Sequence, residues 1–395
     1  MKTKILFVLP EFKFGGTVFS TYNVITLLDP QKYDISVLAM THQGGVKEKY
    51  EKSEIKILPE NIMLSALTGR WNEEKRITRK SFFIFSKIIK RLFSLFGINY
   101  LEYKYGLCAK TYKNYDVVVA CQEGVATMFS SYISAQKRIA WFRSECKYWI
   151  KEVNPDITKA VNIASAYYNK FNSIVCVSET TRKDMGSCLP LISDKLVAIH
   201  NLQDYKKILQ DSADKIEDER FSTDKFTIIS IGRMSPQKRF SEIPAIADKL
   251  RNSGCSFKWY ILGGGNTYNE YDKLVQNIKN KHIEDFVICL GEKLNPYPYI
   301  AHSDLVVNTS YIEACPRVVI ESKIIKTPVV CADFSSSYEF ITDNVDGFIS
   351  DIDNIDKPIS LMIQDKDTYN RIKQCCENYR FSNEALMSKI EELFV

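Results

Sequence analysis

Short apolar runs, many of them β-branched, alternate along the chain with longer segments whose apolar positions recur at helical spacing. Such runs are typical of buried parallel strands, and their alternation with helices indicates βαβ units. The runs expected to form strands cover 5–9, 35–38, 117–120, 174–177, 197–199, 227–231, 259–262, 287–290, 305–307 and 329–331. Because this number is enough for two doubly wound sheets, the sequence predicts an α/β protein with two Rossmann-like domains.

A charged segment poor in large apolar residues separates the two sets of predicted strands. It covers 204–225, and we interpret it as a linker between a first domain over 1–203 and a second over 226–375. Two domains also suit a chain of 395 residues, which is longer than one hydrophobic core usually serves. The remaining residues, 376–395, are assigned to a C-terminal helix, and the amphipathic pattern covers 382–394.

Composition narrows the class of protein. With 45% hydrophobic and 26% charged residues the chain has no signature of disorder, and a net charge of +5 is too small to indicate nucleic-acid binding. A modest basic excess favours anionic partners such as phosphates or acidic lipid surfaces. The eleven cysteines form no Cys-x-x-Cys motif and lie among apolar neighbours, which indicates free thiols in a reducing, cytoplasmic compartment.

No apolar stretch approaches the roughly 20 residues that a transmembrane helix needs. The first apolar run, 5–9, is ended by Pro10 and Glu11 and is read as a strand, not as a signal peptide. We therefore expect a soluble or peripheral protein.

Ligands of open α/β sheets bind beyond the carboxyl ends of the strands, so the loops that follow strands carry the candidate chemistry. Gly15 and Gly16 follow the first strand and precede a predicted helix. They could let backbone amides approach a phosphate or a sugar, or they could form a plain tight turn. No third glycine follows at the spacing of a dinucleotide fingerprint.

Two further glycine loops follow strands of the predicted second domain. Gly232 ends the first of these strands, and Arg233 lies five residues before Lys238. Two cations at this spacing could neutralise a diphosphate leaving group. Solvated loop charges are the alternative. The run 263–265 lacks the lysine and Ser/Thr of a P-loop, and we interpret it as a loop that shapes the cleft or as a structural turn.

The fourth loop, 308–321, is the most specific. Pro316 suits the first turn of a helix that ends before Pro328, which puts Glu313 in the loop and Glu321 in the helix. Free backbone amides near Val318 could then receive a diphosphate, while one carboxylate accepts hydrogen bonds from ribose hydroxyls and the other lies near a sugar. A glycosidase with paired carboxylates is a competing interpretation, but nothing else in the chain supports it.

Together these segments resemble the retaining GT-B glycosyltransferases of family 4, which include builders of bacterial capsules, O-antigens and other surface polysaccharides. The resemblance spans nearly all of 230–348 and is weak in the first half of the chain. Its strongest element is Glu313 with seven residues between it and Glu321, followed by Thr327-Pro328 and Asp346-Gly347. The four loops also occur in the family's order.

The resemblance implies two Rossmann-like domains facing across a cleft, with the C-terminal helix returning to the first. It also implies that Glu321 binds ribose, Glu313 the transferred sugar, and Arg233 with Lys238 the diphosphate, so that Glu313, Arg233 and Lys238 are the expected catalytic residues. Leu290 and Gly291 match the family segment beside the nucleobase. The expected donor-binding residues are Gly15, Gly16, Gly232, Arg233, Lys238, Leu290, Gly291, Glu313, Pro316, Arg317, Val318, Val319 and Glu321.

The chain departs from the family pattern at two places. Many relatives carry a histidine in a segment similar to 139–145, where this chain has Arg143, our candidate for the acceptor side. The glycine that usually follows the first glutamate is Ala314. These changes affect the expected sugar contacts more than the expected fold.

The function expected from the resemblance is transfer of a sugar, with retention, from a nucleotide diphosphate donor to a glycan or lipid-linked acceptor. A UDP-sugar is favoured over GDP-mannose. No cofactor or metal is expected, and Asp351 and Asp353 are interpreted as a solvated turn and not as a metal pair. A nucleotide-sugar epimerase or phosphorylase on the same scaffold is the alternative. An NAD-dependent oxidoreductase is disfavoured by the missing glycine fingerprint, and a noncatalytic binding protein stays open.

A basic and apolar stretch in the first half predicts contact with membranes. Over 73–96, apolar residues at helical spacing lie beside cations, so this stretch could dock on the anionic inner face of the cell membrane. A helix packed into the domain is the alternative. The basic residues of this region are Arg70, Lys75, Arg76, Arg79, Lys80, Lys87, Lys90 and Arg91.

Overall fold

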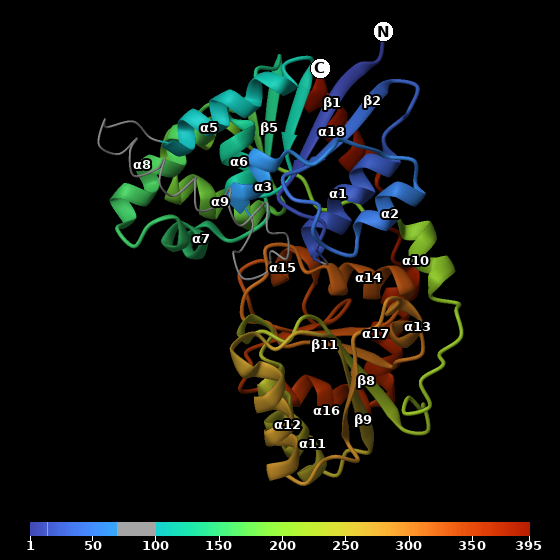
Figure 1. Ribbon diagram of the computed structural model, residues 1–395. Coiled ribbons are helices and arrows are strands. Elements are labelled where there is room, and N and C mark those ends of the chain that lie inside the picture. The colour runs from blue at the N-terminus through green and yellow to red at the C-terminus, as the bar shows by residue number, and fades with distance from the viewer. Residues whose placement is uncertain (14, 69–99) are drawn as a thin grey trace. The chain divides into compact units, whose positions relative to one another are not determined.

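The computed structural model describes residues 1–13, 15–68 and 100–395. The chain divides into two units, the first made of Met1–Leu202 with Asn383–Val395 and the second of Gln203–Ser382. Each unit contains one parallel sheet with helices on both faces (Figure 1). The stretch 73–96, for which membrane docking is predicted, lies outside the described residues.

The first sheet has the strand order β3-β2-β1-β4-β5-β6-β7. The order reverses between β1 and β4, so the loops after these two strands flank a topological switch point. Residues 5–9 are almost completely buried, which explains why this strand is apolar throughout and does not alternate. The strands are β1 (Thr3–Leu9), β2 (Tyr33–Ala39), β3 (Lys56–Ile57), β4 (Val117–Ala120), β5 (Lys137–Phe142), β6 (Ser173–Cys176) and β7 (Leu196–Ala198).

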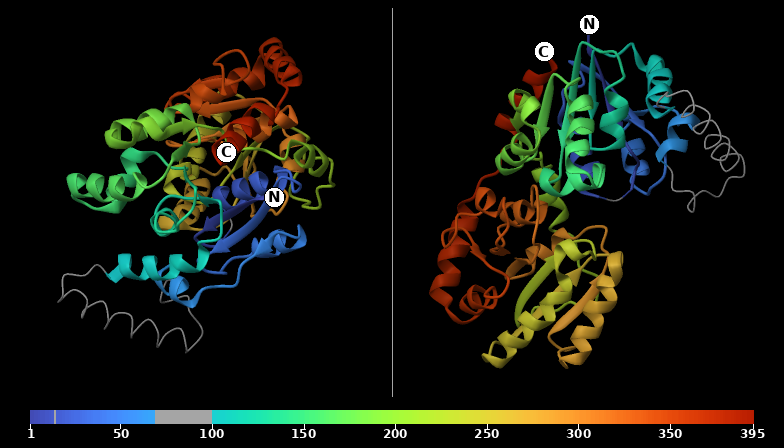
Figure 2. Two further views of the ribbon diagram at one scale, coloured as in Figure 1. Left: turned by 90° about the horizontal axis from the view of Figure 1, so that it is seen from above. Right: turned by 90° about the vertical axis from the view of Figure 1, so that its left-hand side faces the viewer.

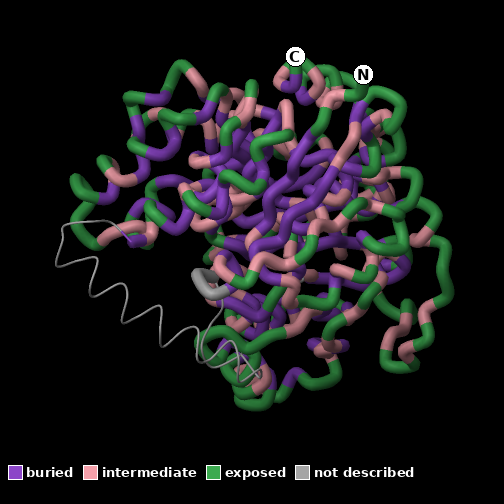
Figure 3. The backbone as a smooth tube through the Cα atoms, turned by 45° about the horizontal axis from the view of Figure 1, so that its top comes forward, coloured by how far each residue is buried: buried purple, intermediate pink, exposed green. Residues whose placement is uncertain are grey.

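Buried residues follow the strands of this sheet (Figure 3). Because successive side chains of a strand point to opposite faces, they form a core on each face. Leu6, Val8, Val118 and Ala140 point to the face covered by α3, α5, α6, α7, α8 and α9. The helical elements of the first unit are α1 (Gly16–Leu27), α2 (Lys47–Lys52), α3 (Ile62–Thr68), α5 (Tyr100–Ala109), η2 (Lys110–Tyr112), α6 (Val125–Ser130), α7 (Cys146–Val153), α8 (Ile157–Tyr168), α9 (Glu179–Cys188), η3 (Pro190–Lys195) and α18 (Glu384–Phe394).

The C-terminal helix α18 packs on the first unit, although the chain has passed through the second unit before reaching it (Figure 2). The rings of Phe394 and Tyr33 meet edge to face at 5.7 Å, and Glu391 lies 3.7 Å from Lys32. This contact confirms the prediction that the last helix returns to the first domain.

The second sheet has the strand order β10-β9-β8-β11-β12-β13. Ile228, Trp259 and Val330 face α11, α12, α16 and α17, while Ile229 and Tyr260 face α13 and α14. The strands are β8 (Phe226–Ile231), β9 (Phe257–Leu262), β10 (Val287–Gly291), β11 (Leu305–Asn308), β12 (Val329–Ala332) and β13 (Phe348–Ser350). The helical elements are α10 (Tyr205–Asp211), η4 (Pro236–Lys238), η5 (Phe240–Glu242), α11 (Ile243–Asn252), η6 (Thr267–Asn269), α12 (Glu270–Asn280), α13 (Tyr297–Ala301), α14 (Arg317–Ile325), α15 (Ser337–Phe340), α16 (Asp356–Gln364) and α17 (Lys366–Asn378).

The structure differs from the expected boundaries in two places. The segment 204–225 begins with α10 and belongs to the second unit, because the ring of Phe221 stacks at 4.6 Å on Tyr260 of β9 and meets Tyr299 of α13. The segment 376–395 is not one helix, because the extended backbone of Tyr379 ends α17 before α18 begins. None of the helices in the described part of the chain is long and apolar enough to span a membrane.

Candidate functional site

The carboxyl edge of the second sheet gathers the loops that follow β8, β9 and β10. Main-chain hydrogen bonds join these loops sideways: the amide of Gly232 donates to Leu262 O at 3.0 Å and that of Gly263 to Gly291 O at 2.9 Å. A third bond runs from the Met234 amide to Gly264 O at 2.9 Å. The loops are therefore fixed to one another before any ligand binds.

Close approach of two backbones explains the glycine at position 263. A Cβ atom built there would lie 1.7 Å from Gly232 O, so no larger residue fits without moving one of the loops. This agrees with interpreting the run 263–265 as a structural turn. Gly264 is also crowded, because a Cβ there would lie 2.7 Å from a carboxylate oxygen of Glu292.

An ion pair joins the two motifs that the sequence presented separately. Lys238 ends η4 after β8, Glu313 lies in the loop after β11, and the ammonium of Lys238 contacts Oε1 of Glu313. The hydroxyl of Ser310 donates to the same oxygen at 2.9 Å. The side chains of Lys238 and Glu313 are only 19% and 14% exposed, so this pair is partly shielded from water.

Neighbouring contacts hold the two loops of this ion pair together. The hydroxyl of Thr309 donates to Lys238 O at 2.7 Å, and the side-chain amide of Gln237 donates to Ile312 O at 2.8 Å. From the loop after β12, the hydroxyl of Ser336 donates to the main-chain oxygen of Glu313 at 2.6 Å. The positions of the cation and the carboxylate are thus set by the sheet and not by each other alone.

Arg233, the second cation expected at the diphosphate, is exposed. It makes neither a hydrogen bond nor an ion pair with any residue that the structure describes. Gly232 beside it leaves room for the stem of Lys238, since a Cβ at Gly232 would lie 3.1 Å from Cε of Lys238. The carboxyl end of β8 therefore presents one paired and one unpaired cation.

Helix α14 begins beside Glu313 and carries the remaining motif residues. Pro316 directly precedes the helix, one residue earlier than predicted, and its oxygen accepts the amides of Val319 and Ile320. The amides of Arg317 and Val318 lie in the first turn, where the helix dipole favours an anion. The helix ends at Ile325, and Lys326 follows it in a left-handed conformation, before Pro328 as predicted.

Glu321 lies one turn into α14 and is only 7% exposed. The guanidinium of Arg317 donates to its Oε1 at 2.7 Å. Burial, and after it the negative charge of Glu321, raises the pKa of the Tyr297 hydroxyl from α13. The structure thus brings Arg317, expected among the donor-binding residues, onto Glu321.

The end of β10 contains Leu290, which is buried, and Gly291, which has a left-handed φ of 77°. Arg220 donates to Cys289 O at 3.2 Å and to Leu290 O at 3.1 Å. Arg220 was not predicted from the sequence, because it lies 70 residues from Leu290, in a segment interpreted as a linker.

The carboxyl edge of the first sheet holds the other predicted residues. Gly15 precedes α1 and Gly16 is its first residue. A Cβ at Gly15 would meet no described atom within 4 Å, so packing does not require a glycine there. Open space of this kind leaves the backbone accessible at the start of a helix.

Arg143 follows β5 and is held by the ends of neighbouring strands. Its Nε donates to Cys121 O at 2.9 Å, and one terminal nitrogen donates to the side chain of Asn201 after β7. Glu123 accepts hydrogen bonds from the Arg143 amide at 3.0 Å and from the hydroxyl of Ser144. It was not predicted from the sequence either. Arg143 therefore links three strand ends of the first sheet.

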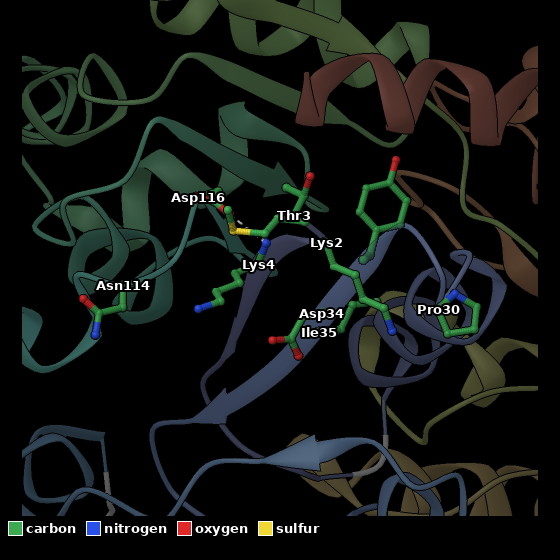
Figure 4. Close-up of a pocket in the computed structure, with 10 residues that line it drawn as sticks. Lys2, Thr3, Lys4, Pro30, Asp34, Ile35, Asn114 and Asp116 are labelled. Atoms are coloured by element: carbon green, nitrogen blue, oxygen red, sulfur yellow. Dashed lines mark hydrogen bonds between the residues drawn. The ribbon is translucent and has the colours of Figure 1, made fainter.

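A cavity of about 830 Å³ lies at the opposite edge of the first sheet (Figure 4). The amino ends of β1 and β2 contribute Lys2, Lys4 and Asp34, and Asp116 accepts the Lys4 amide at 2.8 Å. Ligands of doubly wound sheets bind at the carboxyl ends of the strands. The candidate site is therefore the carboxyl edge of the second sheet and not this cavity.

Comparison with known proteins gives a family match within the second unit. Residues 211–378 match the family described as "Glycosyl transferases group 1". Poly(ribitol-phosphate) alpha-N-acetylglucosaminyltransferase of Staphylococcus aureus is 28% identical over 237 residues, which are 57% of this chain and 44% of that protein.

A second relative comes from Campylobacter jejuni. N-acetylgalactosamine-N,N'-diacetylbacillosaminyl-diphospho-undecaprenol 4-alpha-N-acetylgalactosaminyltransferase is 28% identical over 193 residues, or 49% of this chain and 50% of that protein. This chain spans about half the length of the curated relatives it matches.

Solved structures agree with the fold along the whole chain. Anabaena Alr3699/HepE in complex with UDP has a TM-score of 0.74 at 17% identity and is covered over 99% of both chains. The structure of TarM has a TM-score of 0.71 at 15% identity, covering 100% of this chain and 99% of that one. The predicted α/β fold with two Rossmann-like domains of the GT-B kind is confirmed.

Proposed function

We propose that this protein is a glycosyltransferase that moves a sugar from a nucleotide diphosphate donor onto a glycan or lipid-linked acceptor, with retention at the anomeric carbon. One observation carries the proposal: the partly buried Lys238–Glu313 pair lies at the carboxyl edge of the second sheet, within the residues that match the glycosyltransferase group 1 family. A cation in this place suits a diphosphate, because charge-assisted hydrogen bonds to phosphate are strong and directional.

In the proposed reaction, Lys238 and Arg233 stabilise the negative charge that grows on the diphosphate as it leaves. The bond from the anomeric carbon to the phosphate oxygen breaks, and the acceptor hydroxyl forms the new bond on the same face. The hydroxyl proton passes to the departing phosphate. Amides at the start of α14 would hold this phosphate, and the site would act chiefly through positioning and electrostatics.

The two glutamates take different parts in this proposal. Glu313 accepts hydrogen bonds from the transferred sugar, next to the cation that binds the leaving group. Glu321 accepts hydrogen bonds from the ribose hydroxyls, for which a carboxylate is a stronger acceptor than an amide. Leu290 and Gly291 lie beside the nucleobase in this arrangement.

Known proteins support the substrate classes proposed for this chain. Anabaena HepE has been solved with UDP, with UDP and glucose, and with UDP-glucose, which favours a UDP-sugar donor over GDP-mannose. The names of the Staphylococcus and Campylobacter relatives specify a poly(ribitol-phosphate) and a lipid-linked glycan acceptor. These acceptors support our proposal that this chain acts in the synthesis of a surface polysaccharide, such as a capsule or an O-antigen, in the cytoplasm.

Calorimetry with UDP and GDP, on the wild type and on Lys238→Ala, tests the proposal. Wild-type protein should bind one of the two nucleotides, and the variant should bind it more weakly. Absence of binding to both nucleotides would contradict the donor class.

Three further measurements test the reaction itself. NMR of the product should show the donor's anomeric configuration. Transfer should persist in EDTA, because no metal takes part in the proposed reaction. Incubation of donor without acceptor should yield no epimerised sugar, which separates transfer from the epimerase alternative.

Docking on the inner face of the cell membrane through 73–96 is also proposed, on the sequence of this stretch alone. Each Lys or Arg near an anionic leaflet contributes about 1 kcal/mol, so several could hold the enzyme beside a lipid-linked acceptor. Co-sedimentation with phosphatidylglycerol liposomes at low salt is the expected result. Protein that stays in the supernatant would contradict membrane docking and favour the alternative, a helix packed into the domain.

A further inference from the structure

The segment that precedes β8 contacts the end of β10, an edge strand of the second sheet, through Arg220. Arg220 reaches two successive carbonyls there, with Nη1 on Cys289 O at 3.2 Å and Nη2 on Leu290 O at 3.1 Å. An edge strand has no neighbour on one side, so its outer carbonyls need other donors. Arg220 provides them at the last residues of β10.

Arg220 is itself fixed by a carboxylate two residues earlier. Asp218 accepts Arg220 Nε at 2.9 Å and Nη2 at 2.6 Å, a two-pronged contact that orients the guanidinium plane. Lys293, just after β10, donates to the same carboxylate at 2.7 Å. Asp218 is only 11% exposed, and its bond to Arg220 holds the pKa of that carboxyl well below its usual range.

The main chain held by this network has an unusual local conformation. The pairing of β10 with β9 shifts register between Cys289 and Gly291, and Gly291 has a left-handed φ of 77°. A Cβ at Gly291 would meet no described atom within 4 Å, while Gly291 O accepts the amide of Gly263. The strand end is thus anchored on one side by β9 and on the other by Arg220, with open space beside it.

We propose that Arg220 is a positioning residue that sets nucleobase selectivity by holding the main chain of Leu290 and Gly291. The inference rests on the proposed function, in which this main chain lies beside the base. Pyrimidine and purine edges present donors and acceptors at different places, so a fixed row of amides and carbonyls fits one better than the other. If these main-chain groups can shift, they should bind the preferred base more weakly and discriminate less between pyrimidines and purines.

The test compares Arg220→Ala with Lys258→Ala. Lys258 pairs at 2.9 Å with Asp224 of the same segment, but it belongs to β9 and not to the end of β10, so it is a matched control. Calorimetry would give the affinities of both variants and of the wild type for UDP, GDP and inorganic pyrophosphate. Thermal unfolding of each protein would be followed in parallel.

Arg220→Ala should weaken binding of the preferred nucleotide about tenfold and lower the ratio of UDP to GDP affinity, while pyrophosphate binding changes less than about twofold. Lys258→Ala should leave all three affinities unchanged. If Arg220→Ala does not fold, Asp218→Asn removes the orientation of Arg220 and should give the same pattern more weakly.

Three outcomes would overturn the inference. A folded Arg220→Ala with wild-type UDP and GDP affinities removes the positioning role. Equal losses for nucleotides and pyrophosphate would show a general disturbance of the site. Wild-type protein that binds neither nucleotide contradicts the proposed function as well, whereas the first two outcomes leave that function intact.

Discussion

The carboxyl edges of the two sheets share one topology and differ in what their cations contact. Arg143 of the first unit donates to a main-chain oxygen of a neighbouring strand end and to Asn201. In the second unit Lys238 meets a carboxylate, and Arg233 is exposed with no described partner. The first edge therefore uses its arginine to join strands, while the second keeps one cation, Arg233, available for an anion. One strand order supports both arrangements because the loops, and not the sheet, carry the charges.

The glycines at the two edges differ in the same way. Gly263 is required by a backbone contact inside the protein, whereas Gly15 has open space around its Cα. A glycine loop is thus not by itself a sign of ligand binding. Substitution of Gly263 should therefore change stability, whereas substitution of Gly15 should change binding.

The largest expected effect comes from Lys238→Ala. Transfer should slow about 100-fold or more, the range seen when one group that stabilises developing charge is removed, and nucleotide affinity should fall with it. Steady-state kinetics and calorimetry would measure both. The control is Lys249→Ala, which removes an exposed pair with Asp356 and should leave both values unchanged. Unchanged UDP and GDP affinity in Lys238→Ala would remove its diphosphate role.

Gly263→Ala should reduce the free energy of unfolding by about 2 to 3 kcal/mol, because the new methyl group overlaps Gly232 O. Gly15→Ala should change it by less than about 0.5 kcal/mol, as expected for a site where nothing is displaced. Urea unfolding of the two variants gives the comparison directly. Equal losses of stability would contradict the distinction between the two glycine loops.

Glu321→Gln should weaken donor binding about tenfold without unfolding the protein, since an amide is a poorer acceptor for ribose hydroxyls. Arg317 loses an ionic partner in this variant, so circular dichroism must accompany the binding measurement. If binding stays normal and only turnover falls, Glu321 acts in the chemical step and not on the ribose.

Arg143→Ala tests the cation at the carboxyl edge of the first sheet. It should lower the free energy of unfolding by about 1 to 2 kcal/mol, because Cys121 O and Asn201 lose a donor, yet alter nucleotide affinity by less than about twofold. Chemical denaturation and calorimetry on one preparation would measure both quantities. A tenfold loss of UDP affinity would show instead that Arg143 itself contributes to donor binding.

The two parallel sheets could be predicted from the sequence, because strands and helices follow from spacings of two to four residues. The pattern of apolar runs missed β5 (Lys137–Phe142), since two cations open that strand and only Ile139 of its apolar run is β-branched. In the fourth loop, Pro316 predicted a helix start that leaves Glu313 before the helix and Glu321 within it, and both lie so in the structure.

Which charged groups meet depends on the tertiary structure. Lys238 and Glu313 are 75 residues apart, and they pair because β11 lies directly beside β8 in the sheet. Arg220 reaches Leu290 because Phe221 docks the expected linker onto the second unit, and Arg143 points inward because the ends of β4 and β7 offer oxygens. Local pattern fixes secondary structure, whereas the partner of a side chain depends on strand order, which no short window of sequence contains.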